Sequence, residues 1–128
     1  MASIKYLLVS VVICFATVAT VLAQTDQLDD CARNIKTSNV TALGASFNST
    51  IELSLPGNDA AYSKSQAEMI LKDFFTKNIP SNFVIDHKGT SGGNSKFANG
   101  TLDTSTGRFK VYILIKGNII YELRFDKQ

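Results

Sequence analysis

Cysteine and histidine are scarce in this chain of 128 residues: it has two cysteines, one histidine and no tryptophan. Cys14 lies inside an apolar stretch near the amino terminus, and Cys31 lies beyond it. If that stretch is removed, one thiol remains and no disulfide can form within the chain. A lone cysteine is most often a small apolar side chain in the core. One cysteine and one histidine do not indicate a metal site, and we expect no cofactor.

The chain also lacks a large excess of positive or negative charge. Thirteen lysines and arginines against eleven acidic residues give a net charge of +2, and the basic residues are scattered along the chain. Nucleic acids and anionic membrane surfaces are recognised by concentrated positive charge. The composition therefore favours neither partner.

Residues 1–23 have the pattern of a secretory signal peptide. Lys5 provides a positive start, the stretch from Tyr6 to Leu22 is apolar, and Ala23 provides a small residue at the expected cleavage site. The alternative is a retained membrane anchor, but hydroxyl side chains make the run less apolar than a typical span. We expect cleavage, so that residues 24–128 form one exported domain in the periplasm or outside the cell.

The first half of this domain contains the apolar spacings of three helical segments and one strand. Apolar residues at spacings of three and four predict a helix over residues 26–37, and a helical turn is expected at 40–44. Apolar residues of one parity predict a strand over 47–55. A broad apolar face predicts a longer helix over 66–78.

Capping residues place the start of the longer helix. Ser65 is the expected N-cap, and Glu68 stands at the position that completes a capping box. Pro80 follows the helix and prevents it from continuing.

The second half has a period of two and predicts a four-stranded meander, with strands at 82–88, 96–103, 108–116 and 119–126. Residues paired across strands point to the same face. A three-residue turn at 116–118 would pair Ile113 with Tyr121 and keep Glu122 out of the core. We therefore expect that turn, with Asn118 in the left-handed conformation.

The order of elements is helix, helix, strand, helix and four strands. This order predicts an α+β domain, with the helices packed on the concave face of a curved antiparallel sheet.

Five segments carry a family resemblance: Val40–Leu43, Ile51–Leu53, Tyr62–Ala67, Leu71–Phe75 and His87–Gly89. Together they resemble the exported bacterial family called domain of unknown function 4783. That family is similar in fold to the nuclear-transport-factor-2-like superfamily of cone-shaped, cystatin-like domains. The resemblance implies a pocket between sheet and helices, but no established reaction and no catalytic residues.

Parity suggests which side chains face such a pocket. His87 shares parity with Phe83, and Tyr121 shares parity with an apolar row, so both are expected to point inward. The candidate pocket residues are His87, Tyr121, Phe83 and Phe74. An acid–base pair of His87 and Tyr121 is the enzymatic alternative, although a second group with a clearly different pKa is missing. A cone filled by Phe74, Phe75 and Phe83 would exclude the pocket.

The opposite face of the sheet offers a second candidate site. The predicted registers pair Leu102 with Phe109 on the inner face. On the outer face they pair Phe97 with Leu114 and Tyr112 with Glu122. They place an apolar patch there, rimmed by charges and formed by Phe97, Tyr112, Leu114 and Ile120. Patches of this kind mark partner surfaces, so a homodimer through the outer sheet face is expected.

The sequence thus favours a non-catalytic exported domain that binds a small apolar or amphipathic ligand, or a protein partner. A small-molecule enzyme that uses His87 and Tyr121 is one alternative. A structural protein of the cell envelope is another.

Overall fold

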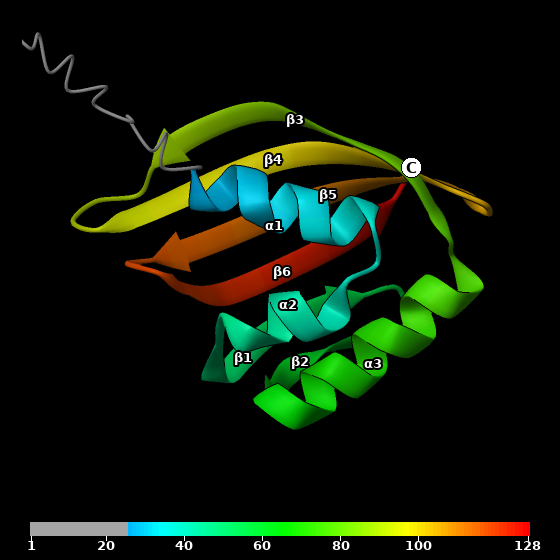
Figure 1. Cartoon of the computed structure of the whole chain (residues 1–128), viewed down its shortest axis with the longest axis horizontal. Helices are drawn as coiled ribbons and strands as arrows, with labels where there is room; N and C mark the ends of the chain where they lie inside the picture. Colours follow the sequence, from blue (N-terminus) through cyan, green and yellow to red (C-terminus); the bar gives the residue numbers. More distant parts are fainter. Residues whose placement is uncertain (1–25) are drawn as a thin grey trace, which may run out of the picture.

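A computed structural model describes residues 26–128; the expected signal peptide, residues 1–23, lies outside the described residues. The described chain forms one six-stranded sheet with helices on one of its faces (Figure 1). In chain order the elements are α1 (Gln27–Lys36), α2 (Val40–Ala45), β1 (Phe47–Leu55), β2 (Asn58–Ser63), α3 (Lys64–Lys77), β3 (Pro80–Thr90), β4 (Ser95–Thr104), β5 (Gly107–Lys116) and β6 (Ile119–Lys127).

The predicted α+β class and the β3–β6 meander are confirmed. Strand order across the sheet is β2-β1-β6-β5-β4-β3. β1 pairs with β6 in parallel, with Leu53 beside Leu123, and every other neighbouring pair is antiparallel. The sheet is curved, and its curvature wraps around the helices (Figure 1). One face is therefore covered by the chain's own helices, and we call the opposite one the outer face.

Strand β2 was not predicted. It follows the turn at Gly57, whose φ of 84° suits glycine, and pairs with β1 at the edge of the sheet. All its side chains are exposed except that of Tyr62, which is half-buried. Because neither face of β2 is buried, its sequence carries no alternation that would reveal a strand.

Helix α3 starts two residues earlier than predicted. Ser63 is the N-cap, and its reciprocal hydrogen bonds with Gln66 form the capping box. Ser65 and Glu68 therefore do not cap the helix. The Glu68 side chain instead lies against Gly44 of α2, where a Cβ atom would collide with it. An added Cβ at Gly44 would push the flexible Glu68 side chain aside.

The turn between β5 and β6 is shorter than predicted. Only Gly117 and Asn118 separate the paired strand ends, and Gly117 adopts the left-handed conformation with φ of 61°. A bulge inside β6 then absorbs one residue, so Ile113 pairs with Leu123 rather than Tyr121. The bulge, and not the turn, keeps Glu122 out of the core.

Aromatic rings occupy the centre of the core. Phe74 and Phe75 of α3 pack against Phe109 and Phe125 of the sheet, with ring centroids 5.3 to 5.9 Å apart. The separations and tilted orientations are those that aromatic pairs prefer. Burial of these rings and of the aliphatic residues around them is the main source of stability.

Candidate functional site

The phenylalanines that were expected to line an interior pocket instead fill that space. Phe74, Phe75 and Phe83 are only 8%, 4% and 8% exposed. The Phe83 ring lies over Gly100, where an added Cβ would come within 2.6 Å of its Cζ atom. Phe74 also borders an open hollow of about 230 Å³ beside Leu55. These phenylalanines therefore serve as core, with one ring reaching the surface.

His87 does not point inward. The β3–β4 register shifts between Ile85 and His87, so His87 pairs with Asn99 on the outer face. Its exposed ring lies 5.7 Å from the ring of Phe97. The parity argument failed because a bulge inserts one residue and reverses the faces of all residues beyond it.

Tyr121 is displaced in the same way by the bulge of β6. Ile115 pairs with Ile120 and Leu114 with Glu122, which leaves Tyr121 as the extra residue. Its half-buried ring lies 4.8 Å from Lys116 Nζ. Strands β4 and β5 separate His87 from Tyr121, so the structure does not bring this acid–base pair together.

The outer face retains three of the four predicted interface residues. Phe97, Tyr112 and Leu114 are half-buried there, and Phe97 pairs with Leu114 as predicted. Ile120 is not on this face: the bulge turns it into the core, where it is 2% exposed.

A row of planar side chains crosses four strands of the outer face. His87 of β3 lies beside Phe97 of β4, and Phe97 stacks on Tyr112 of β5 with centroids 6.2 Å apart. The Arg124 guanidinium of β6 lies 6.0 Å from the Tyr112 ring, a cation–π distance. We call His87, Phe97, Tyr112 and Arg124 the planar row.

Charges of both signs flank the planar row. Asp103 accepts a hydrogen bond from Arg108 at 2.7 Å, and Glu122 accepts one from Arg124 at 2.8 Å. Lys110 and Asp126 also face each other across β5 and β6. Positive and negative groups therefore alternate over short distances along the planar row.

The phenol of Tyr112 lies in the middle of these charges. Burial raises the pKa of Tyr112 above its usual value, and the Glu122 carboxylate adds to this rise. The phenol therefore stays neutral at physiological pH and presents a ring with a hydrogen-bonding tip.

Two kinds of site are absent from the described part of the chain. Residues 26–128 contain no group of three metal-ligating side chains. No helix among them is long and apolar enough to cross a membrane.

Sequence reasoning missed Arg124 as part of the outer site. The predicted register opposed Tyr112 to Glu122, whereas Arg124 is its actual partner. The signal that could have found it is the paired arrangement of charges on β5 and β6, since Lys110 opposite Asp126 requires the shifted register.

Comparisons with known proteins place this fold in a family. The family model described as domain of unknown function DUF4783 matches residues 28–126. A crystal structure of a DUF4783 family protein from Bacteroides ovatus is 30% identical, with a TM-score of 0.70, and the match covers 76% of this chain and 91% of that one. Among curated proteins, no sequence matches this chain.

More distant structures share the fold alone. An NTF2-like protein of unknown function from Cytophaga hutchinsonii is 12% identical, with a TM-score of 0.60 and coverage of 80% of this chain and 88% of that one. A cystatin-fold protein from Novosphingobium aromaticivorans is 12% identical, with a TM-score of 0.57 and coverage of 79% and 95%. With the predicted resemblance confirmed by the family model, the chain belongs to the DUF4783 family and has an NTF2-like α+β fold.

Proposed function

We propose that this protein is an exported, non-catalytic interaction domain that associates with a second copy of itself through the outer face of the sheet. The observation that carries the proposal is the planar row: neighbouring groups of His87, Phe97, Tyr112 and Arg124 lie 5.7 to 6.2 Å apart, and no helix of the described chain covers them.

The apolar content of this face supports a protein partner. Phe97, Tyr112 and Leu114 leave part of their apolar surface in water, and aromatic residues with arginine are the types enriched at the centres of interfaces. Within residues 26–128, in contrast, no polar or charged side chain is buried that could form an acid–base pair in the interior. Partner binding therefore fits the side chains better than catalysis does.

The charges support a second copy as that partner. In a two-fold dimer the same patch meets itself, so a patch of one sign would repel its copy. Here Lys110 stands beside Asp126, and Arg108 beside Asp103. A copy rotated about an axis through the planar row can set its basic groups against the acidic groups of the first.

Export is the second part of the proposal. It rests on the signal-peptide pattern of residues 1–23, and a buried single thiol suits an oxidising compartment because it cannot easily form mixed disulfides. Mass spectrometry of the protein purified from its producing cell should give the mass of a chain that begins at Gln24. A mass that includes residues 1–23 would contradict cleavage.

Light scattering tests the dimer. The protein should have twice the mass of its chain, and Leu114→Asp should halve it, because a charge would then be buried at the centre of the interface. Met69→Asp is the matched control: Met69 is 72% exposed on α3, on the opposite side of the sheet, and its change should leave the mass unaltered. A folded Leu114→Asp variant of unchanged mass contradicts the proposed face.

A further inference from the structure

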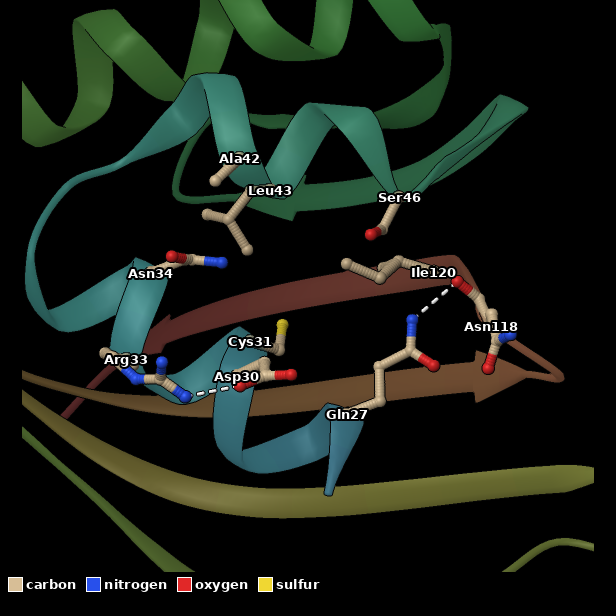
Figure 2. A pocket seen from close by; sticks show the side chains of 10 residues that line it. All are labelled: Gln27, Asp30, Cys31, Arg33, Asn34, Ala42, Leu43, Ser46, Asn118 and Ile120. Carbon is tan, nitrogen blue, oxygen red and sulfur yellow. Dashed lines mark hydrogen bonds and ion pairs between the residues drawn. The ribbon is translucent and has the colours of Figure 1, made fainter. Parts of the chain in front are cut away.

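A second surface feature lies on the helix side of the molecule, away from the planar row. A cleft of about 660 Å³ opens between α1, α2 and the start of β6 (Figure 2). It is lined by Gln27, Asp30, Cys31, Arg33, Asn34, Ala42, Leu43, Ser46, Asn118 and Ile120. Its volume falls within the range of small-molecule sites.

The two ends of the cleft are fixed by hydrogen bonds between distant segments. Gln27 Nε2 donates to the carbonyl oxygen of Asn118 at 2.5 Å, which ties α1 to the β5–β6 turn. The backbone N–H of Ile120 donates to the carbonyl oxygen of Ser46 at 2.7 Å, which ties β6 to the end of α2. The walls are thus held in place without a ligand, and binding would require little rearrangement.

The floor of the cleft is apolar and uncharged. Cys31, Leu43 and Ile120 point toward one another there and are 3%, 1% and 2% exposed (Figure 2). Burial, with a smaller contribution from Asp30, raises the pKa of the Cys31 thiol to about 12. The thiol is therefore protonated and unreactive at physiological pH, and it acts as part of the apolar floor.

The walls carry groups that both donate and accept hydrogen bonds. Three are carboxamides, from Gln27, Asn34 and Asn118, and the fourth is the hydroxyl of Ser46. Within residues 26–128, the side chains of Asn34 and Ser46 make no hydrogen bond, and both lie beside the apolar floor (Figure 2). Such groups match a ligand whose own groups also donate and accept.

The two charged residues that line the cleft, Asp30 and Arg33, neutralise each other. Arg33 donates a hydrogen bond to Asp30, so the two charges on this wall face each other. The cleft therefore has no excess charge that would select an anion or a cation.

From these features we infer that the cleft is a binding site for a neutral, hydroxyl-rich small molecule, of the size and polarity of a monosaccharide or disaccharide. The C–H surface of a sugar ring would lie against the half-buried Ala42, above the closed floor of Cys31, Leu43 and Ile120. Its hydroxyl groups would exchange hydrogen bonds with Asn34, Ser46 and the other carboxamides. This inference does not rest on the dimer, because the cleft and the planar row lie on opposite faces of the sheet.

Amide chemical-shift mapping by NMR tests the site with defined probes. Glucose, galactose, N-acetylglucosamine and maltose should be titrated into the full mature protein. At least one should bind saturably, with a Kd of about 1 mM or tighter, and shift the amides of Cys31, Leu43 and Ser46. If none of the four shifts these amides, or if the shifts lie outside the cleft, the inference is wrong.

Charged derivatives of glucose test whether the site prefers an uncharged sugar. Glucuronate and glucosamine differ from glucose by one negative and one positive group. Neither should bind more tightly than the neutral sugar. A clear preference for either ion would overturn the argument from the Asp30–Arg33 pair.

Two variants locate the contacts. Asn34→Leu keeps the side-chain volume and removes the amide, so it should weaken sugar binding by about threefold to tenfold. Ala42→Phe should weaken binding further by filling the cleft. Asn82→Leu, an exposed position on β3, is the matched control and should have no effect. Equal weakening in Asn34→Leu and Asn82→Leu would contradict the assignment.

Leu114→Asp should alter the mass of the assembly and leave sugar binding intact, so the two proposals can fail separately.

Discussion

The two faces of the sheet use aromatic residues in different ways. On the helix side, Phe109 and Phe125 are 2% and 1% exposed and form a closed cluster with the rings of α3. On the outer side, Phe97 and Tyr112 stack in an open row that remains partly in water. One face therefore holds the fold together, while the other leaves apolar surface in contact with water.

The largest contrast should be in stability. Phe125→Ala removes a ring from the closed cluster and should lower the free energy of unfolding by about 3–5 kcal/mol, through lost burial and the cavity left behind. Leu114→Ala on the outer face should lower it by about 1 kcal/mol, because that side chain is already partly in water. Denaturant titrations at concentrations low enough to keep the protein monomeric would measure both. Similar losses would show that the two faces do not differ as described.

A second prediction concerns the helix-side face where strands β3 and β4 pack together. At Gly100, a Cβ would come within 2.6 Å of Phe83 Cζ and 2.8 Å of the Val84 carbonyl oxygen. Backbone cannot yield easily, so Gly100→Ala should destabilise the protein by about 1–3 kcal/mol through overpacking. Thermal unfolding would measure the loss. A more stable variant would mean that Phe83 has room to move.

The sequence predicted the central strands β4 and β5 better than their neighbours β3 and β6. Phe109, Val111 and Ile113 alternate so regularly that the β4–β5 register, with Leu102 opposite Phe109, was correct. Parity arguments work here because one face is buried and a one-residue slip would expose it.

Predictions failed where a β-bulge places an extra residue in one of two paired strands. The bulges before His87 and at Tyr121 reverse the faces that parity assigns, and neither leaves a local signature of glycine or proline. The cleft was missed for a related reason. Its walls come from α1, α2 and the β5–β6 turn, and only the packing of these segments brings Asn34, Ser46 and Asn118 together.

The smallest effect should come from the ion pairs that tie α1 to the edge of the sheet. Lys88 Nζ lies 2.7 Å from Asp29 and 3.0 Å from Asp26. Its hydrogen bonds to these carboxylates raise the pKa of Lys88, and the same contact lowers the pKa of Asp26. Because the side chains are about one-third exposed or more, Lys88→Met should remove less than about 1 kcal/mol.

The stabilisation by these ion pairs should depend on pH in a defined direction. The raised pKa of Lys88 means that its contribution is complete below pH 10.5 and is lost as pH rises through the folded-state value. The lowered pKa of Asp26 means that its contribution is complete above pH 3.8 and is lost as pH falls through the folded-state value. The stability difference between wild type and Lys88→Met should therefore be constant near neutral pH and shrink at both extremes. A difference that grows at either extreme would contradict the pairing.

The most direct test of the proposed interface is an isotope-filtered NOE experiment on a mixture of labelled and unlabelled protein, which detects contacts between copies alone. We expect intermolecular NOEs between the rings of Phe97 and Tyr112 and the methyl groups of Leu114. NOEs confined to the helix side, for example to Met69, or a spectrum with no intermolecular NOEs, would contradict it.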